Sequence, residues 1–344
     1  MKIRLFVMFC ALGAVCCSTA FAQSASQPEP VLLERMVVSG EQPGPGMWRV
    51  SKGDHVLWIV GTLTPVPKKL TWRAKGIEAL VAQAQEVLGE PAVSVSAKQI
   101  GYFTTLFLLP SAMEARKNPD GATLKDVVPA DLYKRWLLLR DKYVGEYKND
   151  DEENDIERWR PMFAALRLYS RAISDWGMTT ASPVWPAIRD AARKHGVKIT
   201  DVAYYPAISE PRAAINQLKA SRLADLDCLA KTVERIETDL QAMKMRANAW
   251  ASGDIDAIRK SPAIDQRAAC EEAILNASFV RTLGIRDFAA QIETNWLTAA
   301  EAALARNTVT LATLPIAGLV AKDGYLAKLR ARGYAVQEPD STIE

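Results

Sequence analysis

The chain has 344 residues, of which 49% are apolar and 24% are charged, and 43 basic residues nearly balance 40 acidic ones. These values are typical of a globular protein and exclude a collagen-like, coiled-coil or disordered chain. Because there is no excess of positive charge to attract phosphate or anionic lipid, we expect neither nucleic acid nor a membrane surface as the principal partner.

The first 22 residues have the features of a secretory signal peptide. Lys2 and Arg4 precede an apolar run over 5–17, and Ala20-Phe21-Ala22 is a small-x-small cleavage site. We expect cleavage after Ala22 and a periplasmic or secreted mature protein. Beyond this segment, no apolar run reaches the ~20 residues that a membrane-spanning helix needs.

Three of the five cysteines lie in the expected signal peptide, so cleavage would leave only Cys228 and Cys270. In an oxidising compartment we expect these two to form a disulfide. A lipid anchor on Cys16 or Cys17 is a competing interpretation, but the residue before the acylated cysteine would then not be a small one.

The fold is expected to begin after a linker. Residues 23–46 are rich in Pro, Gly and Ser without periodicity, and a single domain is expected over 47–340. Two β-prone runs, 48–50 and 56–60, flank a polar turn and predict a hairpin. The second run is apolar throughout, which is typical of a strand in the middle of a sheet.

The chain then becomes helical for a long stretch. Thr71 is expected to cap a helix that carries Ile77, Leu80, Val81 and Ala84 on one face. A β-prone run at 92–95 and a short strand at 197–202 interrupt the helices, which are expected at 98–109, 130–147, 156–175 and 183–194.

Apolar residues at steps of three and four predict one long amphipathic helix over 211–250, which needs a partner helix. Cys228 lies on this helix and Cys270 on the next helical segment, so the expected disulfide would join two packed helices.

The end of the chain returns to strands. We expect a helix at 287–305, a buried strand at 308–314, a helix at 323–332 ended by Gly333, and a strand at 334–337. With strands at both ends and helices between, the pattern predicts an α/β fold with a mixed central sheet and a large helical insertion at roughly 98–305.

Common catalytic motifs do not occur in the chain after the expected signal peptide. It contains no G-x-S-x-G, phosphate loop, dinucleotide fingerprint, H-E-x-x-H or C-x-x-C. There are two histidines: His55 begins the second hairpin strand, and His195 ends a helix, where a cation suits the helix dipole. Both are interpreted as ordinary structural residues.

Motifs near both ends of the chain carry a family resemblance. They lie at 57–64 (LWIVGTLT), 318–326 (GLVAKDGYL) and 329–334 (LRARGY), with a weaker match in the helical stretch at 249–255. Together they resemble the TraB/GumN family, which is related to the Tiki metalloproteases and to the erythromycin-esterase/ChaN-like fold. The resemblance implies that fold for most of the chain.

The resemblance also implies a divalent metal such as Mn or Co, held by the histidine of two G-x-x-H motifs and by a glutamate. Here the first motif is Gly61 to Thr64, with a hydroxyl at the ligand position, and the second aligns Gly318 with the other histidine. Glu90 is the remnant of the carboxylate. A hydroxyl and one carboxylate are a poor replacement for this ligand set, so we expect no bound metal and no other cofactor.

These substitutions favour an exported TraB/GumN-like pseudoenzyme that acts as a binding or scaffolding protein for a protein or peptide partner. The alternative is a hydrolase or peptidase in which Glu90 is the general base, assisted by Asp201 or Asp323. A third interpretation gives Thr64, Glu90 and Gly318 purely structural roles.

Overall fold

We describe the fold from a computed structural model of the chain. The expected signal peptide and residues 23–40 of the expected linker lie outside the described part. The described residues are 41–94, 102–145, 155–206, 210–221, 223–261, 266–275, 280 and 287–339.

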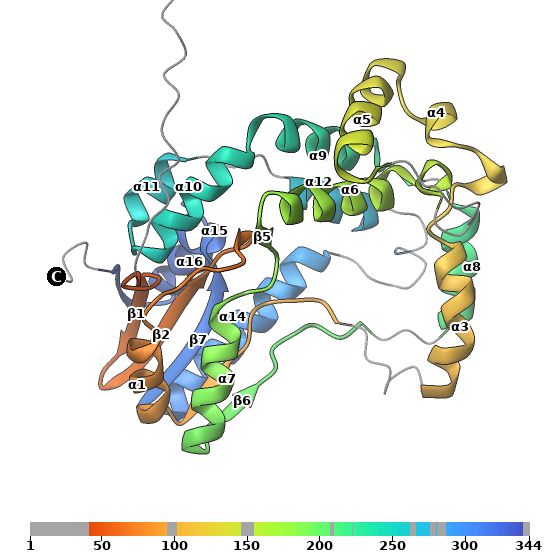
Figure 1. Cartoon of the computed structure of the whole chain (residues 1–344). Coiled ribbons are helices and arrows are strands. Elements are labelled where there is room, and N and C mark those ends of the chain that lie inside the picture. The colour runs from red at the N-terminus through yellow and green to blue at the C-terminus, as the bar shows by residue number, and fades with distance from the viewer. Residues whose placement is uncertain are drawn as a thin grey trace, which may run out of the picture. The chain divides into compact units, whose positions relative to one another are not determined.

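The domain contains a six-stranded sheet in the order β6-β4-β7-β2-β1-β8. Figure 1 labels β1, β2, β7 and β6 of this sheet, at the lower left. The sheet is mixed: β2, β7, β4 and β6 run parallel, and β1 is antiparallel to both of its neighbours. The predicted hairpin, the central position of its second strand and the mixed α/β fold are therefore confirmed. The strands are β1 (Met47–Lys52), β2 (His55–Thr62), β4 (Glu86–Leu88), β6 (Lys198–Thr200), β7 (Val309–Pro315) and β8 (Ala335–Gln337).

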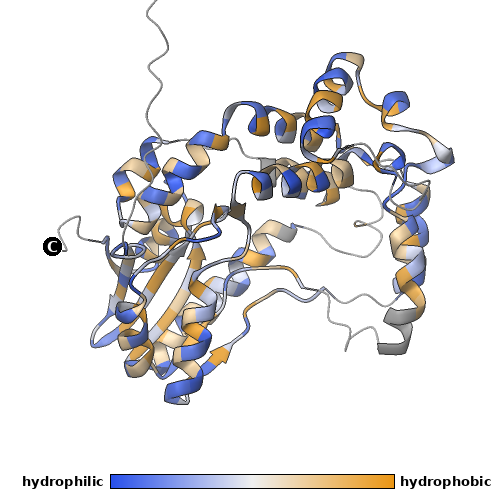
Figure 2. Ribbon diagram, viewed as in Figure 1, coloured by the Kyte–Doolittle hydropathy of each residue, from blue (hydrophilic) through white to orange (hydrophobic). Residues whose placement is uncertain are grey.

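The parallel strand β7, in the interior of the sheet, is covered on both faces. In β7, five successive residues from Thr310 to Leu314 are buried, although alternate side chains point to opposite faces of a sheet. Helices α1 (Lys75–Gln83), α7 (Val184–His195) and α14 (Phe288–Arg306) contribute to the same core, and Figure 2 shows the strands mainly in the hydrophobic colours. Helices α7 and α14 thus belong to the sheet core and strand β6 pairs with β4 in the sheet, although all three fall within the range expected for the insertion.

A second core lies among the helices. It gathers buried side chains from α4, α5, α6, α9 and α12, and α10 connects the two cores because Met243 belongs to the helical core and Trp250 to the sheet core. The helices of this part are α3 (Tyr102–Glu114), α4 (Leu124–Val127), α5 (Ala130–Tyr143), α6 (Pro161–Asp175), α8 (Pro211–Ala220), α9 (Leu226–Thr238), α10 (Leu240–Ala251) and α12 (Gln266–Leu275), with 3-10 turns at Pro119–Gly121 and Ile156–Arg158. Helix α11 (Ile255–Lys260) follows α10 and packs in the sheet core.

The prediction of one long helix over 211–250 is wrong, because this segment forms α8, α9 and α10. Two buried aspartates lie at the breaks. Asp225 accepts a hydrogen bond from the backbone N–H of Met162 at 2.9 Å and so caps α6. Asp239 pairs with Arg246 at 2.9 Å. Carboxylates committed to these partners favour a turn over a continuous helix.

Two further local predictions are wrong. Helix α1 begins at Lys75 after Ala74, so Thr71 does not cap it; the Thr71 carbonyl instead accepts a hydrogen bond from the N–H of Gln42. The strand expected at 92–95 is reduced to a bridge between Val93 and Tyr204, with Val95 outside the described part. The true strand of this region is β4, which is only three residues long.

The remaining elements are a short strand pair and two helices near the carboxyl end. Strands β3 (Val66–Pro67) and β5 (Met178–Thr179) form a separate pair that was not expected. At the carboxyl end, α15 (Ile316–Val320) precedes α16 (Tyr325–Ala331). Helix α16 ends at Ala331 and Gly333 follows its C-cap as predicted; this glycine has φ +85°, and its N–H donates to the Arg330 carbonyl.

The end of the expected linker is packed against the domain. The N–H of Gly44 donates to the carbonyl of Ala251 at 2.8 Å, and the N–H of Arg73 donates to the carbonyl of Gln42 at 2.7 Å. Gly44, Pro45 and Gly46 are buried. The domain therefore includes residues from 42 onward.

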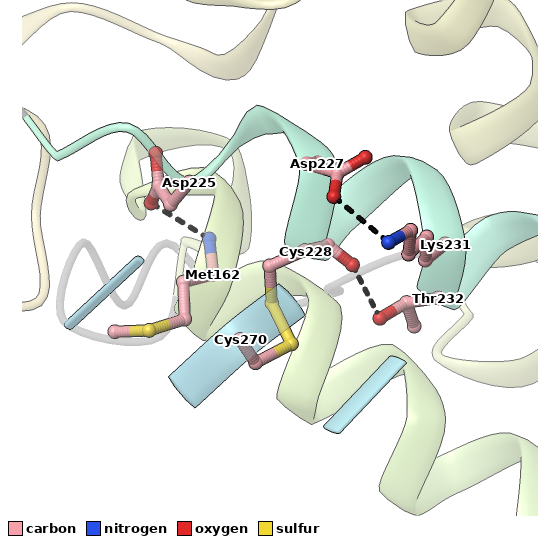
Figure 3. Close-up of a disulfide and its surroundings, with 7 residues drawn as sticks. All are labelled: Met162, Asp225, Asp227, Cys228, Lys231, Thr232 and Cys270. Carbon is pink, nitrogen blue, oxygen red and sulfur yellow. Dashed lines mark hydrogen bonds and ion pairs between the residues drawn. A yellow bond between two sulfur atoms is a disulfide. The ribbon is translucent and has the colours of Figure 1, made fainter. Parts of the chain in front are cut away.

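The expected disulfide is present in the structure: Cys228 of α9 and Cys270 of α12 are bonded, with their Cα atoms 4.5 Å apart (Figure 3). Beside it, Thr232 donates to the Cys228 carbonyl at 2.7 Å and Asp225 accepts from Met162. The bond therefore joins two helices within the helical core. Within the described ranges, no helix combines the length and hydropathy needed to cross a bilayer.

Candidate functional site at the carboxyl edge of the sheet

The positions implied by the resemblance meet at one edge of the sheet. Strands β2, β7 and β4 run parallel, with Thr62 beside Pro315 and Leu88 beside Ala312. Their carboxyl ends therefore lie at the same edge, where open α/β sheets form ligand crevices. The segments that follow these strands carry Thr64, Glu90 and Gly318. We call this region the carboxyl edge.

The first position is held by close backbone packing. The carbonyl of Gly61 accepts a hydrogen bond from Nε1 of Trp250 at 2.7 Å. A Cβ atom at Gly61 would lie 2.9 Å from Cζ3 of Trp48, so glycine is needed there for packing. Thr64 follows in the loop after β2, and its side chain is exposed.

The second position is filled by an aromatic ring. A Cβ atom built on Gly318 would lie 3.2 Å from Cδ2 of Tyr325. That tyrosine packs edge-on against Trp296, with the ring centroids 5.1 Å apart. A side chain at residue 318 would therefore require the tyrosine ring to move.

A second tryptophan fixes the end of β4. Nε1 of Trp296 donates to the carbonyl of Gly89, just after β4, at 3.0 Å, as Trp250 does to the Gly61 carbonyl near the end of β2. Sequence analysis missed both roles. Trp250 lies in the helical stretch of the resemblance, whereas Trp296 carries no local signal beyond an aromatic residue in an apolar helix.

Glu90 lines a cavity of about 390 Å³ at the carboxyl ends of β4 and β6. The cavity brings Glu90 together with Asp201, one of its two expected assistants, and with Trp185 and Arg189 of α7, which sequence analysis missed. The remaining lining residues are Gly89, Ala92, Ile199, Thr200 and Ala203. Asp323 is not among them, because it lies in the turn between α15 and α16.

The two carboxylates of this cavity differ in their hydrogen bonding. Asp201 accepts from the N–H of Ala203 at 2.8 Å and from the hydroxyl of Tyr205, and this second bond raises the pKa of the tyrosine. For Glu90, Oε1 is buried and accepts no hydrogen bond from the residues that the structure describes. Burying an acceptor without a donor costs free energy of folding. The Glu90 carboxylate therefore differs from that of Asp201, whose hydrogen bonds are made within the protein.

The other ends of the same strands, which we call the amino edge, carry a second buried carboxylate. Glu86 accepts from Nη2 of Arg306 at 2.5 Å, from Nδ2 of Asn307 at 3.0 Å and from the hydroxyl of Thr200. Burial alone would raise the pKa of Glu86, but the three hydrogen bonds and the arginine charge outweigh burial and lower it.

Both histidines lie away from the carboxyl edge. His55 begins β2 at the amino edge, and its Nδ1 lies 2.7 Å from the carbonyl oxygen of Asn307. His195 is the last residue of α7, followed by Gly196 with φ +67°. Neither side chain is placed to replace a ligand beside Thr64 or Glu90.

Comparison with known proteins gives one match. Residues 46–338 match the model of the TraB/PrgY/gumN family. The chain belongs to this family. Comparisons with curated proteins and with solved structures gave no significant match.

The residues at the carboxyl edge do not fit the divalent metal that the resemblance implies. Gly318 has no side-chain donor atom and a side chain there would meet Tyr325, Thr64 offers an exposed hydroxyl, and Glu90 offers one carboxylate. Transition metals in proteins are held by several imidazole, thiolate or carboxylate ligands. Across the described residues, no three His, Cys, Asp or Glu side chains gather in a way that could hold a metal ion.

Proposed function

We propose that this TraB/PrgY/gumN-family chain is an exported binding or scaffolding protein that lacks the metal-dependent hydrolase activity implied by the resemblance. The observation that carries the proposal is the Tyr325 ring, 3.2 Å from the Cβ that a ligand residue at 318 would need. It supports the proposal because both the missing donor and the filled space at this position act against a metal site.

The test is metal analysis of the purified protein, followed by calorimetric titration with Mn²⁺ and Co²⁺. We expect no stoichiometric binding in the micromolar range or tighter. Stoichiometric binding of that strength, with peptide hydrolysis that chelation abolishes, would contradict the proposal. A Glu90→Gln variant serves as the control, because any residual weak binding through the remaining carboxylate should disappear in it.

Export is the second part of this proposal. It is supported by the basic and apolar pattern of the first 22 residues and by the Cys228–Cys270 bond, since disulfides persist mainly in oxidising compartments. Cell fractionation and amino-terminal sequencing test it. We expect a mature chain beginning at Gln23 outside the cytoplasm; an uncleaved chain in the cytoplasm would refute export, and an acylated cysteine would favour the lipid anchor.

One observation favours a second candidate function. Glu90 and Asp201 line the same cavity, and the buried Oε1 of Glu90 has no donor among the described residues. A carboxylate in such a place can act as a general base in a hydrolase that uses no metal. Ester and peptide substrates should then be turned over by the wild type and not by Glu90→Gln; no turnover, or turnover that this variant retains, rejects this candidate.

A further inference from the structure

The cavity at the ends of β4 and β6 has the size and lining of a ligand site. Its volume of about 390 Å³ falls within the range of small-molecule pockets, roughly 300–1,000 Å³. One wall is the partly buried indole of Trp185, packed on the sheet core, and further apolar surface comes from Ala92, Ile199 and Ala203. A ligand with an apolar part would therefore bury surface here.

The charged groups of the lining favour a cation. Two residues with carboxylates, Glu90 and Asp201, line the cavity together with one residue that carries a guanidinium, Arg189, which is an exposed residue of α7. Asp201 already accepts two hydrogen bonds within its own loop. Glu90 therefore has the acceptor capacity that remains for a ligand.

The state of the Glu90 carboxylate points to the donor that is needed. Its buried Oε1 meets no N–H or O–H of the described residues. Glu90 is one of the residues that line the cavity, so a cationic group bound there can pair with this carboxylate. An ammonium or guanidinium would supply both charge and donors, and such charge-assisted hydrogen bonds are stronger than neutral ones.

The neighbouring indole suits the same class of ligand. Trp185 lines the cavity together with Glu90. Cations are attracted to the face of an indole ring, and the apolar stem of a lysine or arginine packs well beside it. We infer that this cavity binds a basic side chain of a protein or peptide partner, with its cation on Glu90 and its stem on Trp185.

This inference rests on the proposed binding function and names the chemistry of its partner. The probes are Nα-acetyl-lysine N-methylamide and Nα-acetyl-arginine N-methylamide, which separate the two sources of a basic side chain. The corresponding norleucine and glutamate derivatives test the need for charge and its sign. Binding is measured by titration calorimetry and ligand-observed NMR on the full-length mature protein.

We expect one or both basic probes to bind, the norleucine probe to bind more weakly and the glutamate probe not to bind. Glu90→Gln keeps the shape of the side chain and should weaken basic-probe binding by about tenfold, because a charged hydrogen bond is lost. Trp185→Leu should weaken it by about threefold. Asp323→Asn is the matched control, since Asp323 does not line the cavity, and it should bind like the wild type.

The outcomes separate the two proposals. No binding of either basic probe, equal binding of the glutamate probe, or unchanged binding in Glu90→Gln would overturn the inference while leaving the proposed function intact. Stoichiometric Mn²⁺ or Co²⁺ binding in the same calorimetric series would instead overturn the proposed function. Circular dichroism and the midpoint of urea unfolding show whether each variant is folded.

Discussion

The two edges of the parallel sheet carry one buried or partly buried glutamate each, and they use it differently. At the amino edge, Glu86 is 4% exposed and accepts hydrogen bonds from Thr200, Arg306 and Asn307. At the carboxyl edge, Oε1 of Glu90 is buried without a hydrogen-bond donor among the described residues, and Glu90 lines a cavity. Satisfied polar groups stabilise a fold, whereas unsatisfied ones beside a cavity indicate a place for a ligand.

The same difference extends to neighbouring polar groups. At the amino edge, Nδ2 of Asn307 also donates to the hydroxyl of Thr310 at 3.2 Å. Towards the carboxyl edge, the buried Nε1 of Trp48 and the buried hydroxyl of Thr313 have no hydrogen-bond partner among the described residues. The hydrogen-bonded Glu86 thus supports stability, whereas ligand binding beside Glu90 is our proposal; Thr200 belongs to both surroundings, because it donates to Glu86 and also lines the cavity.

The largest effect should come from the disulfide, which lies in the helical core and belongs to neither edge. Replacing both cysteines, Cys228→Ser and Cys270→Ser, opens a 42-residue loop and should lower the free energy of unfolding by roughly 3–4 kcal/mol in the chain-entropy model. Urea unfolding measures this loss. Probe binding at the carboxyl edge should remain, because the bond does not contact the cavity.

The bond itself is checked in the wild type. Non-reducing gel mobility of the pure protein should change when thiol is added. Labelling of two free thiols in the unfolded, unreduced protein would contradict the pairing of Cys228 with Cys270.

The next largest effect on stability should come from removing the hydrogen-bonded carboxylate at the amino edge. Glu86→Leu leaves the donors of Thr200 and Asn307 without their acceptor and should cost about 2–3 kcal/mol of the free energy of unfolding. Glu90→Leu is the matched change at the carboxyl edge, where the buried Oε1 accepts no hydrogen bond from the described residues, so it should cost much less. Equal losses for the two variants, measured by urea unfolding, would remove the contrast between the edges.

The sequence predicts the elements whose pattern is local. The apolar runs at 56–60 and 308–314 predict the two central parallel strands, and the charged and glycine residues at the end of the chain predict where α16 stops. The sequence pattern does not predict strand β4, because the strand has three residues and begins with Glu86, whose hydrogen-bond partners come from other elements. A short strand with a paired carboxylate gives no alternating apolar signal.

The helix breaks at Asp225 and Asp239 are not predicted either, because they also depend on contacts that a local pattern does not show. Asp225 accepts from the Met162 N–H, which is distant in the sequence and is brought close only by tertiary structure. Asp239 pairs with Arg246, which lies in the helix that follows it. At the candidate site, the resemblance placed Glu90 and Gly318 at one edge. It could not place Trp185, Trp296 or Tyr325 there, because their positions depend on how helices pack on the sheet.

A substitution at Gly318 tests whether Tyr325 closes the second position. Gly318→His places new atoms against the tyrosine ring and should cost about 1–3 kcal/mol of the free energy of unfolding, as overpacking does. In a Tyr325→Ala background the same change should cost less, because the ring is gone. A double-mutant cycle measures this coupling, and strictly additive losses would show that the ring does not fill the position.

The smallest effect concerns pH and the amino edge alone. The pKa of Glu86 is lowered below its ordinary value of 4.5 in the folded chain, so the folded state holds the proton less tightly than the unfolded state. Its stabilising contribution should therefore be complete above about pH 4.5 and be lost as the pH falls through the lower, folded-state pKa. Urea unfolding of wild type and Glu86→Gln between pH 3 and 7 should show a stability difference that shrinks only at the acidic end.

Arg306→Met removes a cation and a donor from Glu86, which raises the pKa of this carboxyl and should move the loss to higher pH. A difference that stays constant down to the lowest pH would mean that the ionised form of Glu86 is not what the amino-edge hydrogen bonds stabilise.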